Sequence, residues 1–161
     1  MNGLLEVFYD DHEHALAQLN QLEKYLEYIK KNGEAEKVRI QLISFSKFLE
    51  IALDIHFVQE EEALFPLLVQ KIGPNGPVMV MEMEHGDLRE SQKALKALLT
   101  KEELDKEAIL EHGGRILSVL REHIAKENQV LFPLSERVLT EEEWKQAEKI
   151  AGEIALGQKL A

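Results

Sequence analysis

The sequence predicts an all-α protein, an up-down-up-down four-helix bundle followed by a short C-terminal fifth helix. Apolar side chains recur every three or four residues through most of the 161-residue chain, which is the period of an amphipathic helix. Strong turn chemistry is confined to Asn32-Gly33 and to the glycine–proline cluster at residues 73–77, with a weaker break near Thr100. Long helices joined by short loops run antiparallel to their neighbours, so these signals favour the bundle.

The turn signals divide the chain into five expected helices. Their approximate ranges are 4–31, 34–71, 78–99, 101–138 and 141–157. Thr100 with Glu103, and Thr140 with Glu143, have the spacing of a capping box, in which the two side chains satisfy the first backbone N–H groups of a helix. These two pairs therefore mark the expected starts of the last two helices.

The chain is expected to form one bundle domain over residues 1–138, with a C-terminal helix over residues 139–161. Trp144, Ala147 and Ile150 share one face of that last helix. This face is expected to pack on the bundle, or alternatively to form a homodimer contact.

Prolines and a glycine pair lie within two of the long expected helices. Pro66 and Pro133 each fall near a helix end, where the ring is expected to kink or end the helix. The Gly113-Gly114 pair lies inside the fourth helix, and the sequence leaves open whether it marks a break or a close helix contact.

Composition excludes several classes of partner and site. Thirty acidic against nineteen basic side chains give a formal charge of −11, which repels nucleic acid and anionic membrane surfaces. The chain has no cysteine, so disulfides and thiolate metal sites are excluded. The first residues lack the basic and apolar regions of a signal peptide, and no apolar run approaches the roughly 18 residues of a membrane span. We therefore expect a cytoplasmic protein.

A repeated motif is the most informative feature of the chain. His56 and Glu60 are separated by one helical turn, and His123 and Glu127 repeat this spacing, so in each pair both side chains leave the same helix face. Both copies are followed by the same Leu-Phe-Pro-Leu segment. An imidazole and a carboxylate stacked in this way make half of a metal site, and the chain contains two such halves.

Two further histidines lie on the apolar faces of the remaining helices. His85 continues the apolar stripe of the third helix, and His12 precedes Ala15 and Leu19 on the stripe of the first. His14 is rotated about 200° from His12 and is expected to face solvent. The bundle interior should thus receive one histidine from each helix and a glutamate from two of them.

Burying six such side chains together is energetically unfavourable unless something neutralises them. An unpaired buried polar group costs about 1–3 kcal/mol, and an unpaired carboxylate more, against a total stability of about 5–15 kcal/mol. A dinuclear cation site would satisfy all six. The alternatives are a buried His–Glu hydrogen-bond network and a metal-free structural bundle.

These residues resemble the hemerythrin-like, or HHE cation-binding, domain over about residues 5–135. The resemblance implies a non-heme di-iron centre whose irons are bridged by Glu60 and Glu127. It implies His12 and His56 as terminal ligands of one iron, and His85 and His123 of the other. Imidazole and carboxylate ligands without sulfur suit iron, with manganese or zinc as possible substitutes.

One departure from the oxygen-carrying hemerythrins bears on function. Those proteins place a fifth histidine one turn before the helix-3 histidine, where this chain has Met81. Met81 is expected to pack in the core, with Glu82 or Glu84 as possible replacement ligands. Two histidines and two carboxylate oxygens fill about four of six octahedral positions on each iron. The more open centre is expected to bind or react with O2, NO or peroxide, or to sense or store iron.

A ferritin-like di-iron carboxylate oxidase is the alternative metalloprotein. That class uses a carboxylate three residues before a histidine on two helices, which Glu82 with His85 matches and Asp11 with His14 matches weakly. This scheme needs His14 rather than His12 inside the bundle. Three further side chains are expected to be solvent-exposed without a role: Glu61, Glu62 and His112.

Overall fold

The computed structural model describes the backbone of residues 2–160 and the side chains of residues 2–157. It contains α-helices with short 3-10 and π segments, and no strand within that range. The α-helices are α1 (Gly3–Asn32), α2 (Arg39–Phe48), α3 (Asp54–Gln59), α4 (Phe65–Ile72), α5 (Pro77–Leu99), α6 (Lys106–Lys126), α7 (Phe132–Val138) and α8 (Glu141–Leu160). The other segments are the 3-10 turn η1 (Ala35–Val38) and the π segments η2 (Leu49–Leu53), η3 (Glu60–Leu64) and η4 (Glu127–Leu131).

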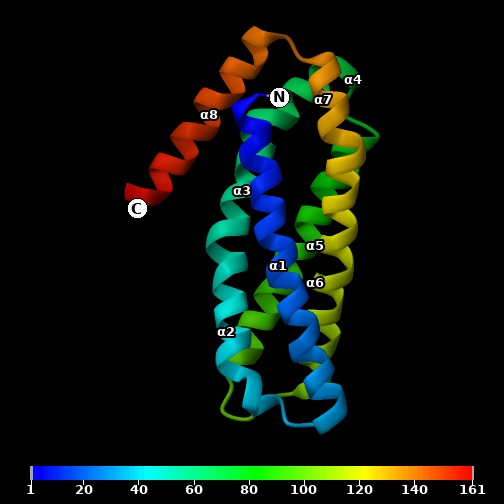
Figure 1. The fold of residues 1–161 in the computed structure, drawn as a ribbon, viewed down its shortest axis with the longest axis vertical. Helices are drawn as coiled ribbons and strands as arrows, with labels where there is room; N and C mark the ends of the chain where they lie inside the picture. Colours follow the sequence, from blue (N-terminus) through cyan, green and yellow to red (C-terminus); the bar gives the residue numbers. More distant parts are fainter. Residues whose placement is uncertain (1, 161) are drawn as a thin grey trace.

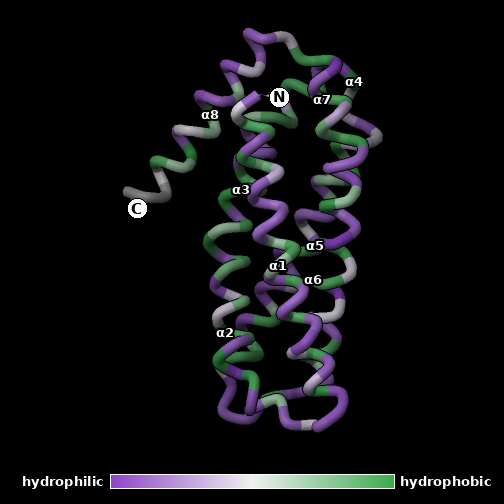
Figure 2. Tube along the Cα trace, in the orientation of Figure 1, coloured by the Kyte–Doolittle hydropathy of each residue, from purple (hydrophilic) through white to green (hydrophobic). Residues whose placement is uncertain are grey.

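Four antiparallel rods form the bundle, as the sequence predicted (Figure 1). The first rod is α1, the second runs from α2 to α4, the third is α5, and the fourth is α6 with α7. Green and purple stretches alternate along the rods in Figure 2, as expected for helices that bury one face. The fifth helix, α8, starts at the top of the view, passes beside the N-terminal end of α1 and runs down at an angle to the bundle (Figure 1). Trp144, Ala147 and Ala151 of α8 are buried.

Local signals set the ends of α1 and α8. The Asn2 side chain accepts a hydrogen bond from the Leu5 N–H, and Gly33, with φ of 67°, closes the other end of α1 by donating to Ile29 O. A residue with a Cβ is strained at that φ, which explains the Asn32-Gly33 signal. The Thr140–Glu143 capping box is confirmed, since each side chain binds the other's backbone N–H.

The expected start of the fourth helix at residue 101 was wrong. Helix α6 begins at Lys106, and its N-cap is Asp105, whose carboxylate accepts from the Ala108 N–H. The Thr100 hydroxyl donates instead to Ala97 O, at the end of α5. The reason is tertiary. The Arg39 guanidinium donates to the carbonyl oxygens of residues 99, 101 and 102, so the carbonyls of residues 101 and 102 are not available to a helix that starts at residue 101.

The two prolines do not end their helices. Helix continues to Ile72 beyond Pro66 and to Val138 beyond Pro133. Each proline is the second residue after a π segment, where the backbone pattern already changes and a missing N–H is tolerated. Of the two expected effects, a kink or an end of the helix, the end does not occur at either proline.

The Gly113-Gly114 pair marks a close contact between helices and not a helix break. Helix α6 runs unbroken through residues 113 and 114. A Cβ on Gly113 would lie 2.9 Å from Cδ2 of Leu26 on α1, whereas a Cβ on Gly114 would meet nothing within 4 Å. Of the two glycines, only Gly113 lies at a close contact between α1 and α6.

A polar layer divides the apolar core into two clusters. The cluster toward the η1 end of the bundle includes Leu19, Leu95 and Leu120, and the one toward α8 includes Phe8 and Phe65. The buried residues between them include His12, His56, Glu60, His85, His123 and Glu127. The fold thus positions these six side chains at one level of the bundle. Among the described residues, no helix is both long and apolar enough to cross a lipid bilayer.

Candidate metal centre

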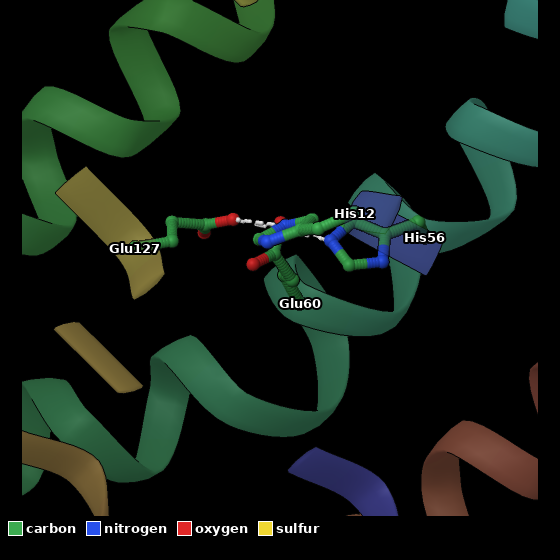
Figure 3. A group of neighbouring side chains, drawn as sticks. All are labelled: His12, His56, Glu60 and Glu127. Atoms are coloured by element: carbon green, nitrogen blue, oxygen red, sulfur yellow. Dashed lines mark ion pairs between the residues drawn. The ribbon is translucent and has the colours of Figure 1, made fainter. Parts of the chain in front are cut away.

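The six residues singled out by the sequence lie together in the core. Each has a side chain no more than 1% exposed. They come from all four rods: His12 from α1, His56 and Glu60 from α3 and η3, His85 from α5, and His123 and Glu127 from α6 and η4. His12, His56, Glu60 and Glu127 point toward one another in Figure 3.

Two overlapping groups of these residues have the geometry of metal sites. One contains His12, His56, Glu60 and Glu127, and the other contains Glu60, His85, His123 and Glu127. Within each group, one ligand atom from every residue lies within 4.8 Å of all the others. Both glutamates belong to both groups, so each carboxylate can serve two cation positions.

Each carboxylate lies between two imidazoles, as the shortest O–N distances show. Oε1 of Glu60 lies 3.4 Å from Nε2 of His56 and 3.2 Å from Nε2 of His85. Oε1 of Glu127 lies 3.0 Å from Nε2 of His12 and 3.5 Å from Nε2 of His123. Each glutamate therefore faces one histidine of each group, which is the arrangement a bridging ligand requires.

The inward-facing atoms lack hydrogen-bond partners. These atoms are both carboxylate oxygens of Glu60 and of Glu127, and Nε2 of His56, His85 and His123. Although some of their separations are short, none of these atoms forms a hydrogen bond in the structure. Buried polar atoms without partners are unfavourable by about 1–3 kcal/mol each. The donor set fits a cation that accepts imidazole nitrogen and carboxylate oxygen together.

The outer nitrogen of every histidine is satisfied by a second residue. Nδ1 of His12 lies 2.6 Å from Asn128 Oδ1, and Nδ1 of His56 lies 2.9 Å from Asp11 Oδ2. Nδ1 of His85 lies 2.7 Å from Glu61 Oε2, and Nδ1 of His123 lies 3.0 Å from Glu84 Oε1. An acceptor at Nδ1 keeps the proton there and leaves Nε2 free to bind a metal.

Sequence reasoning missed this outer ring. Glu61 was expected to be exposed, yet its side chain is 27% exposed and binds His85 and Arg89. Glu84, considered as a ligand, binds His123 and Lys126 instead. A signal was available, because every outer residue is adjacent in sequence to one of the six inner residues.

Electrostatics of the site follow from this pairing. Burial alone lowers the pKa of the His123 imidazole, but Glu127, Glu84 and Glu60 outweigh it and raise that pKa to about 9. Burial raises the pKa of the Glu61 carboxyl, but His85 and Arg89 outweigh burial and lower that pKa to about 2. Glu61 thus remains an anion at neutral pH. A metal ion entering the site must displace protons from imidazoles that the carboxylates make more basic.

Aromatic rings enclose the site. The ring of Phe57 stacks on His85 with centroids 3.8 Å apart, and Phe132 stacks on His12 at 5.3 Å. Phe8 meets His56 edge-on at 4.8 Å. A surface pocket of about 230 Å³ is also lined by Phe57, together with Leu88 and Arg89. The Phe57 ring therefore contacts both this pocket and a histidine of the site.

Other residues considered from the sequence lie elsewhere. His14 has a side chain 70% exposed and pairs with Asp10, and Glu82 is exposed. The ferritin-like scheme, which places His14 inside, is therefore not formed. Glu62 is exposed as expected, whereas His112 is half-buried, with a buried Nδ1 that lacks a partner. Met81 is buried in the apolar cluster toward α8.

A comparison with protein families identifies this arrangement. The model of the hemerythrin HHE cation binding domain matches residues 3–135, which is most of the chain. The chain belongs to the hemerythrin HHE cation-binding family. The resemblance seen in the sequence is thereby confirmed, and family membership together with the two His/Glu groups indicates non-heme iron binding.

Curated relatives in the hemerythrin family match over most of this chain. The iron-sulfur cluster repair protein YtfE of Citrobacter koseri is 30% identical over 134 residues, which cover 78% of this chain and 60% of the relative. Proteins of the same name from Escherichia coli O1:K1 and Escherichia fergusonii are 29% identical with the same coverage. The chain thus spans about three fifths of the length of these relatives.

Proposed function

We propose that this protein holds a non-heme di-iron centre in the middle of the bundle. His12 and His56 would bind one iron, His85 and His123 the other, and Glu60 and Glu127 would bridge them. The observation that supports this most strongly is the layer of buried, partnerless Nε2 and carboxylate atoms that all face one another. Manganese or zinc could occupy the same ligands, although iron is the expected ion.

The remaining residues prepare the site rather than bind the metal. Asp11, Glu61, Glu84 and Asn128 accept the Nδ1 protons, which fixes each imidazole with Nε2 inward. The phenylalanine rings keep bulk water away from the ligands. A bound pair of irons would supply redox chemistry and coordination positions for a small molecule.

The proposed ligand is a small molecule such as NO, O2 or peroxide. Two histidines and two shared carboxylates would supply only about four of the six ligands that an iron commonly takes, which would leave room for a small molecule. Met81 occupies the place of the fifth histidine found in oxygen carriers, and it packs with apolar neighbours. Because the similar proteins are named for iron-sulfur cluster repair, we propose a role in the response to cluster damage, in which NO or peroxide would be the reactant. A homodimer contact through α8 also remains a proposal.

Iron analysis and optical spectroscopy of the purified protein test this function. We expect about two irons per chain, near-ultraviolet ligand-to-metal bands, and a spectral change when NO or peroxide is added. His12→Ala should lower the iron content, whereas His14→Ala, a little more than half a turn away on the surface, should keep it. Equal iron loss in both variants, or no iron in the wild type after reconstitution, would contradict the proposal.

A further inference from the structure

The outer ring of the site has an approximate two-fold pattern. Asp11 precedes the inner His12, and Glu84 precedes the inner His85. Each of these residues accepts from the histidine of a His-x-x-x-Glu motif, His56 for Asp11 and His123 for Glu84. The helix pair α1/α3 therefore corresponds to the pair α5/α6.

The second half of the pattern involves the residues that follow the glutamates. Glu61 follows Glu60 and accepts from His85, and Asn128 follows Glu127 and accepts from His12. The two positions correspond, but one carries a carboxylate and the other a neutral amide. Asn128 therefore keeps the hydrogen bond of the corresponding Glu61 but lacks its negative charge.

Because of this difference, the two metal positions have unequal numbers of carboxylates behind their histidines. His85 and His123 both donate to carboxylates, Glu61 and Glu84. Of the other pair, only His56 donates to a carboxylate, because His12 donates to the Asn128 amide. A carboxylate acceptor makes the imidazole a stronger ligand, and removal of such a partner typically lowers metal affinity by about 10- to 100-fold.

Nearby cations accompany two of these carboxylates. Arg89 binds Glu61 and Lys126 binds Glu84, yet both carboxylates still accept from their histidines, at 2.7 Å from Nδ1 of His85 and 3.0 Å from Nδ1 of His123. Their contacts also hold the two carboxylates in place against His85 and His123. Asp11, by contrast, is paired with His56 alone among the described ion pairs, and its side chain is 35% exposed.

We propose that the two positions bind iron unequally and that Asn128 is the positioning residue that sets the difference. The His85/His123 position is the tighter one, and the His12/His56 position is the weaker one, which loads last and releases its ion first. The inference rests on the proposed di-iron site. It assigns to one defined position the iron available for exchange with a chelator or an acceptor protein.

Stepwise loading of the metal-free chain with Fe(II), under anaerobic conditions and against a chromophoric chelator, tests this proposal. The wild type should show two dissociation constants separated by about 10-fold or more. Asn128→Asp should strengthen the weaker step by about 10- to 100-fold and leave the tighter step unchanged. Glu84→Gln should weaken the tighter step by a similar factor. Gln129→Glu, an exposed neighbour of Asn128, adds the same charge without the hydrogen bond and should change neither constant.

The outcomes separate this inference from the di-iron proposal itself. Two ions bound with equal constants in the wild type, or an Asn128→Asp variant that leaves the weaker step unchanged, would overturn the inference alone. Failure to bind a second ion would overturn the di-iron proposal. Circular dichroism checks the fold of each variant, and if Asn128→Asp does not fold, the direction of the Glu84→Gln effect decides.

Discussion

The two His-x-x-x-Glu repeats have the same backbone and the same inner residues but different neighbours. In both, a π segment begins at the glutamate, Glu60 or Glu127, and ends just before Phe-Pro. The residue after the glutamate is Glu61 in the first repeat and Asn128 in the second. Both residues accept from a histidine on another rod, but Glu61 is a carboxylate that also binds Arg89, whereas Asn128 is a neutral amide.

The residue after the histidine differs as well. Phe57 follows His56 and stacks on His85 at 15° and 3.8 Å, whereas Ile124 follows His123 and packs in the core. His85 is thus enclosed by a phenylalanine and held by a carboxylate, and His12 is stacked by Phe132 and held by an amide. The comparison teaches that the repeated residues build the inner site, while the unrepeated ones make its two positions unequal.

The largest effect is expected when either glutamate is replaced, and it tests whether each glutamate binds at both metal positions. Glu60 and Glu127 both belong to both ligand groups, so Glu60→Gln or Glu127→Gln should each remove both metal ions. His12→Ala, which belongs to one group, should remove mainly one. Metal analysis of the purified variants measures this. If Glu127→Gln kept one ion in full occupancy, the carboxylates would not bridge.

Removal of the metal should destabilise both repeats together. Without an ion, the buried atoms of Glu60 and Glu127 have no partners. Each ion present at about 100 times its dissociation constant stabilises the fold by about 2.7 kcal/mol. Thermal unfolding with and without a chelator should therefore show a clear fall in Tm. An unchanged Tm at full metal removal would contradict metal binding to the folded site.

A change just before the second repeat separates bundle stability from metal binding. Gly113 lies ten residues before His123, and the corresponding residue of the first repeat is Ser46. Gly113→Val should destabilise the fold by about 1–3 kcal/mol, because the side chain collides with Leu26. The matched control Gly114→Val has open space. Urea unfolding measures the difference, and equal effects of the two variants would contradict the close helix contact.

The smallest expected effect comes from a change one turn before an inner histidine, and it concerns ligand binding. The residue there is Phe8 on α1 and Met81 on α5, both buried in the same cluster. Met81→His should place an imidazole beside the His85/His123 position and fill an open coordination site. Azide titration followed optically should then show about half the bound azide per iron pair, with Met81→Leu as the unchanged control. Undiminished azide binding would place the open site elsewhere.

The fold and the inner ligands could be predicted because their signals are local or periodic. Asn32-Gly33 ends α1 through the conformation of one glycine, and Thr140–Glu143 starts α8 through contacts three residues apart. His12 could be distinguished from His14 because two residues along a helix turn the side chain about 200°. These features need only the chain's immediate neighbourhood.

The misjudged features depend on residues far apart in the chain. The start of α6 moved to Lys106 because Arg39 holds carbonyl oxygens about sixty residues away. Glu61 was expected in solvent, and its position became clear only when α5 placed His85 and Arg89 beside it. Adjacency to Glu60 marks Glu61 as a candidate, but it does not say which residue on another rod Glu61 will contact.

The sequence by itself determined the helices, the inward faces and the six side chains that meet in the core, because helical periodicity fixes the direction of each residue. Only the tertiary structure decided which neighbour holds which imidazole, because those hydrogen bonds join different rods. Asn128 shows the difference most clearly. Its amide looks like an ordinary polar residue in the chain, and it acquires meaning only from the histidine 116 residues away that it faces.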